Sequence, residues 1–205
     1  MSHSRKPARS FFVQSTLRVA RELIGMHLVH RTPEGTRWRG RIVETEAYQG
    51  PQDLAAHSAR GRTPRTQVMY GPPGHAYVYF IYGMWNCLNV VTARAGRPHA
   101  VLLRALEPIS DPAARTWGPG LLCQAFQIGR ELNGADLLGP RLWLEYPPAR
   151  EPAARIARAT RIGVDYAKEW ADKPWRFFDA DSAYVSTASS SARTAARASR
   201  TPVGK

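Results

Sequence analysis

The chain has few cysteines and no long hydrophobic run. Its two cysteines, Cys87 and Cys123, have no neighbours at metal-ligand spacing. We expect both to be reduced and packed as small apolar residues, as in a cytosolic protein; a disulfide or a catalytic thiol is the less favoured alternative. No apolar run reaches the roughly 18–20 residues that cross a bilayer. Residues 1–6 lack the apolar segment of a signal peptide. We therefore expect no membrane association.

Several signatures of cofactor chemistry are also missing. The sequence contains no glycine-rich phosphate loop, no HExxH, no zinc-spaced Cys/His set and no nucleophile elbow. The run Gly71-Pro72-Pro73-Gly74 is typical of turns rather than of a phosphate-binding loop. We expect neither a metal ion nor a nucleotide cofactor.

Acidic residues are scarce. The 205 residues include 29 Lys and Arg against 16 Asp and Glu, a net charge of +13. Such an excess favours a polyanionic partner, nucleic acid before an anionic membrane surface. Residues 1–10 are predicted to be a flexible basic arm, and residues 183–205, rich in Ser, Ala and Arg, a disordered tail. These ends hold seven basic residues and no acidic one, so the single domain predicted for residues 11–182 is basic too.

The hydrophobic pattern indicates a mixed α+β fold. An amphipathic helix is expected over residues 16–24, with Thr16 as its N-terminal cap and Gly25 at its end. A second helix is expected over residues 119–128 and should end at Gly129. A short helix is expected near residues 53–57, inside a long loop over residues 49–75 that is rich in Gly, Pro and Arg. Alternating runs predict strands, with hairpins around residues 33–35 and 83–85. The predicted strands cover residues 26–32, 36–48, 76–82, 86–93 and 100–107, with weaker signals at 141–146, 158–163 and 175–178.

Two carboxylates stand on one predicted strand. If that strand is regular, Glu44 and Glu46 share a face with Ile42 and Tyr48. Buried carboxylates need cationic or hydrogen-bonding partners. Arg104 lies within an apolar run and would equally need an acid to meet. A Glu–Arg pair on adjacent strands is structural by itself, and becomes catalytic if a water molecule lies between the two groups.

Aromatic and polar side chains cluster on the neighbouring strands. Tyr79 and its aromatic neighbours are most often core residues, but in a basic protein such faces also stack on bases. Tyr82 precedes a predicted turn, where an exposed ring could wedge into a base stack. Asn89 lies between apolar residues, and a buried amide either satisfies the backbone or reads a ligand. His57 follows two alanines near the long loop, and a structural role is the simpler interpretation for it.

A series of ordered motifs resembles the alkyladenine (3-methyladenine) DNA glycosylase family. The resemblance covers roughly residues 10 to 180, and an ordered series is far more specific than any single motif. Trp85-Asn86 departs from the pattern, since other members often have different residues there. The motifs are Arg41-Ile42-Val43-Glu44-Thr45-Glu46-Ala47-Tyr48, Ala55-Ala56-His57-Ser58, Thr63-Pro64-Arg65, Tyr77-Val78-Tyr79, Ile81-Tyr82-Gly83-Met84, Leu88-Asn89, Val101-Leu102-Leu103-Arg104-Ala105-Leu106-Glu107-Pro108, Leu122-Cys123-Gln124-Ala125 and Arg161-Ile162-Gly163-Val164.

The resemblance implies a fold and a function. It implies a single domain around a curved antiparallel sheet flanked by helices, with a protruding hairpin. It also implies base-excision repair by a monofunctional, cofactor-free, monomeric enzyme that acts on double-stranded DNA and flips out damaged purines. The enzyme would be cytoplasmic, and nucleoid-associated in a prokaryote. The expected substrates are 3-methyladenine, 7-methylguanine, hypoxanthine and ethenoadenine.

The resemblance also implies a role for individual residues. Glu46, rather than Glu44, matches the general base, and Arg104 with the Val164 carbonyl matches the groups that hold the attacking water. The purine would lie between walls matching Tyr48, His57 and Tyr79. Asn89 matches the residue that clashes with the guanine 2-amino group, and Tyr82 the residue that fills the gap in the duplex. The sequence leaves two alternatives, a noncatalytic lesion-binding protein and an RNA-directed hydrolase.

Overall fold

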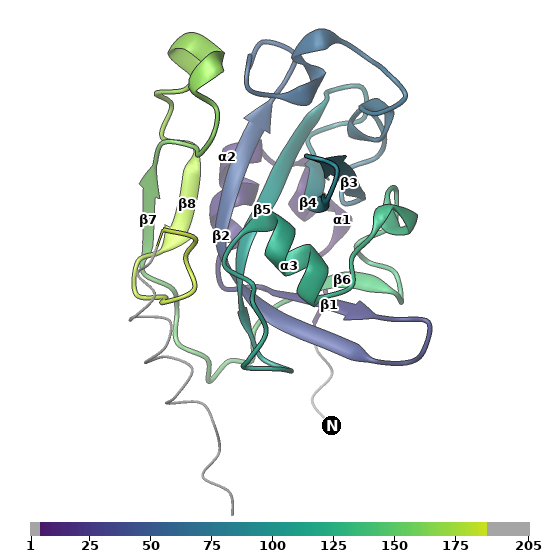
Figure 1. Cartoon of the computed structure of the whole chain (residues 1–205), viewed down its shortest axis with the longest axis vertical. Helices are drawn as coiled ribbons and strands as arrows, with labels where there is room; N and C mark the ends of the chain where they lie inside the picture. The colour runs from purple at the N-terminus through teal and green to yellow at the C-terminus, as the bar shows by residue number, and fades with distance from the viewer. Residues whose placement is uncertain (1–4, 188–205) are drawn as a thin grey trace, which may run out of the picture.

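The computed structural model describes residues 5–187 and shows one curled antiparallel sheet with short helices packed around it (Figure 1). The strand order is β3-β4-β5-β2-β1-β6, and β8 joins β2 to β7. The predicted α+β class with a curved antiparallel sheet is confirmed. The strands are β1 (His27–Arg31), β2 (Arg37–Gln49), β3 (Ala76–Ile81), β4 (Trp85–Thr92), β5 (His99–Pro108), β6 (Leu142–Glu145), β7 (Ile156–Ala159) and β8 (Arg176–Asp179).

Strand β2 is the centre of this sheet. Along one edge it pairs with β5, over residues 40–49. Along the other edge its first half pairs with β1, and residues 44–46 pair with β8 (Figure 1). The strand is therefore covered on both edges and, from residue 42 to 47, buried on both faces. Polar side chains on a buried strand of this kind are held in fixed positions, because they must hydrogen-bond to protein groups rather than to solvent.

A β-bulge interrupts β2 where it changes partners. The pairing with β5 skips Val43 on one strand and Arg104 on the other. Ile42 and Ala47, five residues apart, consequently both pack in the main core, while Val43 packs in a separate cluster on the other face. The prediction that Ile42 shares a face with Glu44 and Glu46 is therefore wrong, because the bulge moves the side chains after it to the opposite faces.

The helices differ from the predictions mainly at their ends. The first predicted helix begins after Ser15, whose hydroxyl accepts the Arg18 N–H, while the Thr16 hydroxyl bonds Thr92 in the core. Helix α3 ends at Ala125, and the residue with positive φ beyond it is Gln127 rather than Gly129. The helices are α1 (Arg9–Val13), α2 (Thr16–Glu22) and α3 (Pro119–Ala125), with 3-10 turns η1 (His57–Arg60), η2 (Gln67–Tyr70), η3 (Arg130–Leu132) and η4 (Asp165–Trp170).

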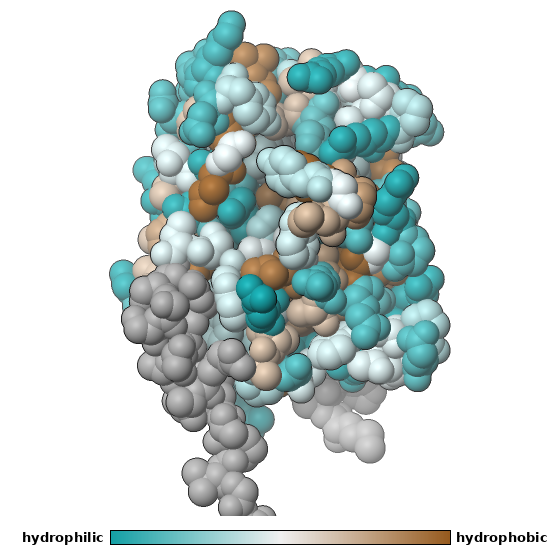
Figure 2. All heavy atoms as spheres, viewed as in Figure 1, coloured by the Kyte–Doolittle hydropathy of each residue, from teal (hydrophilic) through white to brown (hydrophobic). Residues whose placement is uncertain are grey.

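Helix α2 packs against β2, β5 and β8, and α3 packs against β4 and β5 (Figure 1). The short helix expected near residues 53–57 is a turn followed by η1, which begins at His57. On the face seen in Figure 2, hydrophobic side chains form small separate areas among hydrophilic ones. The loops and the hairpin β3–β4 therefore present mixed surfaces around the sheet.

Both predicted ends contribute to the packed structure. In the arm predicted for residues 1–10, Lys6 donates to the Leu138 and Gly139 carbonyls, and Arg9 begins α1 and pairs with Asp136. In the tail predicted for residues 183–205, Tyr184 and Val185 are buried. The packed chain thus runs to at least residue 186, because these apolar side chains find partners on the sheet. Residues 1–4 and 188–205 of the two predictions lie outside the described part.

Candidate active site

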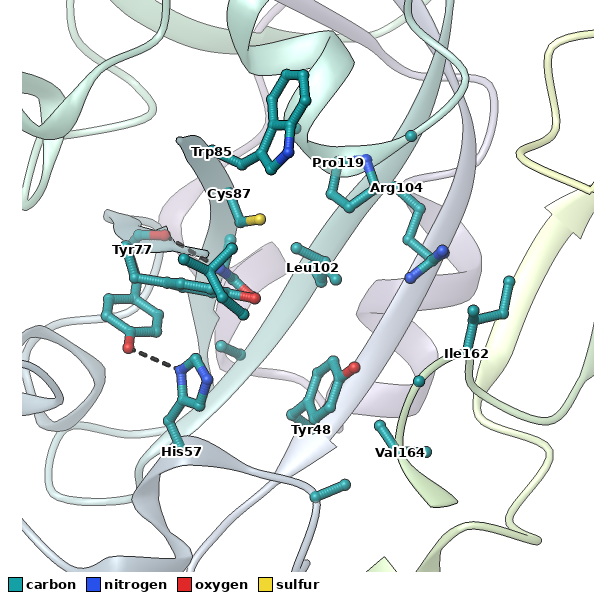
Figure 3. A pocket seen from close by; sticks show the side chains of 18 of the residues that line it. Tyr48, His57, Tyr77, Trp85, Cys87, Leu102, Arg104, Pro119, Ile162 and Val164 are labelled. Carbon is teal, nitrogen blue, oxygen red and sulfur yellow. Dashed lines mark hydrogen bonds between the residues drawn. The ribbon is translucent and has the colours of Figure 1, made fainter. Parts of the chain in front are cut away.

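A cavity of about 460 Å³ lies between the hairpin β3–β4, the C-terminal half of β2 and the loop before η4. Its size is within the range of small-molecule sites. Figure 3 shows His57 and Tyr77 on one side of the cavity, and Tyr48, Arg104 and Val164 on the other. The sequence-predicted residues that line it are Tyr48, His57, Tyr79, Tyr82, Asn89, Arg104 and Val164.

Glu46 lies behind the cavity wall and is fully buried. Its Oε2 accepts the Tyr48 hydroxyl at 2.7 Å and lies 3.3 Å from Arg104 Nη1. Its Oε1 accepts the Ile162 N–H at 2.8 Å. A carboxylate offers about four acceptor directions, so three donors leave room for a water molecule. All three partners line the cavity, so Glu46 is linked to that space through each of them.

Arg104 lies between two carboxylates. Its Nε is 3.4 Å from Glu44 and its Nη1 is 3.3 Å from Glu46. The acid that the sequence required for this buried arginine is therefore present twice. Burial lowers the pKa of Arg104, but the Glu46 and Glu44 carboxylates outweigh that effect and the net direction is upward. The guanidinium is a permanent cation at the cavity wall.

Aromatic rings form the opposite walls. The His57 and Tyr79 ring centroids are 4.5 Å apart with an edge-to-face geometry, and His57 Nδ1 lies 3.0 Å from the Tyr77 hydroxyl (Figure 3). Burial, followed by the Arg65 and Arg60 charges, lowers the pKa of His57 to about 4. Burial also raises the pKa of Tyr48, and the adjacent Glu46 charge raises it further. At neutral pH the His57 imidazole is therefore uncharged. The Tyr48 phenol stays protonated, and its O–H donates a hydrogen bond to Glu46.

Asn89 projects from β4 into the floor of the cavity. Its side chain is buried, and Nδ2 donates to the Tyr77 carbonyl at 3.1 Å on the paired strand. This bond fixes the orientation of the amide, so the group it presents to the cavity is fixed as well.

Tyr82 stands at the tip of the hairpin and is 83% exposed. Tyr82 and Gly83 both have positive φ and are the central residues of the β-turn in which the Met84 N–H donates to the Ile81 carbonyl. The left-handed conformation is unfavourable for tyrosine, and such strain is concentrated at functional sites. Trp85, where the sequence departs from the family pattern, is half-buried and packs closely on Gly120. A Cβ atom on residue 120 would lie 2.8 Å from the Trp85 indole. Trp85 thus braces the base of the hairpin on α3.

A second ion pair lies beneath Tyr48 and was not predicted from the sequence. Asp53 and Arg161 are fully buried and joined by two bonds of 2.6 and 2.9 Å. Arg161 also donates to the Ala47 and Trp170 carbonyls, and its guanidinium lies 4.8 Å from the Tyr48 ring centroid. The pair therefore anchors both Tyr48 and the loop that carries Ile162 and Val164. An arginine and an aspartate 108 positions apart gave no signal by which they could have been paired in advance.

The Val164 backbone lies at the start of η4. Its carbonyl accepts the Ala167 N–H at 2.9 Å, and a second lone pair remains for another donor. The exposed Arg60 ends η1 and the exposed Arg62 follows it, and the Arg65 guanidinium lies 5.2 Å from the Tyr79 ring. This side of the cavity is therefore positively charged and suited to phosphates.

The cysteines and the potential metal ligands were also located in the described residues. Cys87 and Cys123 are free and buried, and burial raises the pKa of both thiols. Residues 5–187 contain no group of three or more His, Cys, Asp or Glu placed to hold a metal ion. Within the same residues, no helix has the length and apolar character needed to cross a membrane.

Comparison with known proteins gives the class of enzyme. A family model described as methylpurine-DNA glycosylase (MPG) matches residues 10–183. The protein is therefore a DNA glycosylase, a hydrolase of DNA repair that acts on DNA. More particularly, the chain belongs to the methylpurine-DNA glycosylase family.

Relatives in several organisms are about half identical. The first, from Anaeromyxobacter sp. (strain Fw109-5), is 53% identical and covers 89% of this chain and 93% of its own length. Relatives from Legionella pneumophila (strain Corby) and Methanocella arvoryzae are each 50% identical, covering 89% and 87% of this chain and 98% and 94% of their own lengths. All three bear the name "Putative 3-methyladenine DNA glycosylase".

Proposed function

We propose that this glycosylase excises 3-methyladenine and related purines (7-methylguanine, hypoxanthine and ethenoadenine) from duplex DNA, using a water molecule activated by Glu46. The observation that carries the proposal is the fully buried Glu46 carboxylate, joined to Tyr48, Arg104 and Ile162 at the wall of an aromatic cavity. The names of the relatives support 3-methyladenine as a substrate. The product is an abasic site, and the enzyme acts as a monomer without a cofactor, in the cytoplasm or at the nucleoid.

The reaction begins when the damaged nucleotide leaves the duplex. Extrusion costs a few kcal/mol, and less for a weakly paired lesion, which gives part of the selectivity. Tyr82 is the residue that enters the gap, since it is exposed at a hairpin tip beside the cavity. The purine then stacks between Tyr48 and the His57–Tyr79 wall. An alkylated purine carries positive charge, and tyrosine faces stabilise it further.

Hydrolysis at the sugar C1′ passes through a state with oxocarbenium character. A water molecule between Glu46, Arg104 and the Val164 carbonyl attacks C1′ while Glu46 accepts its proton. The new C–O bond forms as the C–N bond breaks, and the bonding electrons leave with the purine. A cationic alkylated purine is a good leaving group without help. Neutral hypoxanthine gains from protonation, so its release depends more on acid assistance.

Selectivity against normal guanine is assigned to Asn89. Its amide is held by the Tyr77 carbonyl and lines the cavity, so it cannot turn aside from a 2-amino group. Adenine derivatives and hypoxanthine lack that group. 7-methylguanine carries it, and its release relies on the positive charge of the alkylated ring, which makes it a good leaving group despite the contact with Asn89.

The experiment is base release from defined duplexes in the presence of EDTA. Duplexes with a single hypoxanthine or ethenoadenine, and alkylated DNA, are incubated with the purified protein, and abasic sites are revealed by alkali. The proposal predicts release from at least the alkylated DNA and no release by Glu46→Gln, with lesion binding retained. Tight lesion binding without release by the unaltered protein would overturn it, as would equal activity on RNA carrying the same base.

A further inference from the structure

The fully buried Glu44 has more partners than a spectator residue requires. Its Oε1 accepts from Arg176 Nη1 at 3.0 Å and from the Ser186 hydroxyl at 2.9 Å, and it lies 3.4 Å from Arg104 Nε. Its Oε2 accepts the Ser186 N–H at 2.7 Å. Three hydrogen bonds and an ion-pair contact with Arg104 therefore fix the position of this carboxylate.

The partners of Glu44 and Glu46 form one buried network. Arg104 contacts both carboxylates, and Arg176 pairs with Glu44, so two cations face two anions. The bulge in β2 and β5 places Glu44 and Arg104 at the same irregular point of the sheet. Tyr48 donates to Glu46 on this side, and the nearby Arg161 is paired with Asp53.

The Arg104 guanidinium is therefore fixed from two directions. With Glu46 alone it could rotate about its long side chain, because one ion pair leaves that rotation free. The contact of Nε with Glu44 removes this freedom and keeps Nη1 on Glu46. An effect on the chemical step follows, since misplacing a catalytic group by about 1 Å can lower a rate by about 100-fold.

The segment that holds Glu44 lies just past the family match, which ends at residue 183. Tyr184 packs with Val43 and Ala105, on the same stretch of β2 and β5. Val185 is buried, and Ser186 then supplies two of the donors to Glu44. The apolar contacts of Tyr184 and Val185 thus set the position at which Ser186 reaches the carboxylate.

We infer that Glu44 is a positioning residue for Arg104, and that residues 184–186 form a C-terminal latch that locks Glu44 in place. The inference rests on the proposed function, in which Arg104 and Glu46 hold the attacking water. It assigns to this segment a part in catalysis although none of its residues lines the cavity. The latch holds Glu44 in place. Glu44 then orients Arg104, and Arg104 holds the attacking water.

The test measures single-turnover release of hypoxanthine from a duplex, with lesion binding measured separately. Full-length Glu44→Gln should bind the lesion within about twofold of the unaltered protein and react on the order of 30-fold more slowly. Ser186→Ala, which removes one hydrogen bond to the carboxylate, should be slower by roughly 3- to 10-fold. Thr187→Ala, an exposed neighbour, is the matched control and should react normally.

The split between binding and chemistry separates positioning from a purely structural role. A positioning defect slows the single-turnover step while the affinity for the lesion-containing duplex stays the same. A variant that is merely less stable loses binding and release together, in proportion to the unfolded fraction. Should Glu44→Gln fail to fold, the Ser186→Ala and Thr187→Ala pair carries the test alone.

The outcomes distinguish this inference from the proposed function. Normal single-turnover rates in Glu44→Gln and Ser186→Ala, with an inactive Glu46→Gln, would overturn the inference alone. Normal activity in Glu46→Gln would overturn the proposed function on which it rests. Slower chemistry with unchanged lesion binding in both latch variants, and normal Thr187→Ala, supports it.

Discussion

The buried ion pair between Asp53 and Arg161 should be far more important for stability than an exposed pair of the same type. Asp53→Asn leaves the Arg161 guanidinium without a counter-charge in a fully buried position. Breaking such a pair by removing one partner lowers the free energy of unfolding by about 3–5 kcal/mol. Asp53 also accepts the Gln49 and Ala55 N–H groups, so an amide places a donor against donors.

The chain provides a matched control for this substitution. Asp181 also makes bidentate bonds to an arginine, Arg155, but both side chains are about two-thirds exposed. Asp181→Asn should leave the unfolding midpoint unchanged, because solvent screens such pairs. Asp53→Asn should lower the melting temperature on the order of 10 °C for a domain of this size. Chemical and thermal denaturation of both variants measure the difference, and equal midpoints would refute the claim that the Asp53–Arg161 pair is a buried anchor.

Three further predictions concern the cavity and the hairpin. Tyr82→Ser should lower excision of a paired lesion by roughly tenfold, because no side chain then fills the gap in the duplex. Met84→Ser changes another exposed residue of the same turn and should alter excision little. Similar losses in both variants would contradict the role of Tyr82 as the residue that enters the duplex. Asn89→Ala should raise release of guanine by about tenfold, and release that stays at background contradicts the steric role. Because the folded-state pKa of His57 is about 4 against an ordinary 6.5, the unfolded chain takes up its proton first as pH falls. Stability should therefore decline by up to about 3 kcal/mol from pH 6.5 to 4, and His57→Gln should flatten this part of a urea-denaturation series; an unchanged slope would contradict it.

The sequence was informative wherever a side chain was chemically out of place. Arg104 in an apolar run required an acid, and the structure supplies Glu44 and Glu46. Alternation located the main strands to within one or two residues, since a half-buried strand repeats every two residues. Tyr82 was expected in a turn, and it is the exposed tip of the hairpin.

The features that the sequence did not reveal depend on contacts between distant residues. A β-bulge is set by the neighbouring strands, so the face of Ile42 could not be read from its own strand. The Asp53–Arg161 pair and the bond from Ser186 to Glu44 join segments more than 100 positions apart. The alternation pattern in β2 reports only which residues are apolar, whereas these pairings arise when the sheet curls.

The role of Glu46 is the central claim, and a single-turnover assay of Glu46→Gln tests it most directly. The variant keeps the shape of the side chain but cannot accept a proton from water, and Glu44→Gln is its matched comparison on the same strand. The structure predicts that Glu46→Gln binds lesion-containing duplex normally and releases no base, while Glu44→Gln is slowed but active. A Glu46→Gln protein that releases base at the normal rate, beside an inactive Glu44→Gln, would contradict the assignment of the general base.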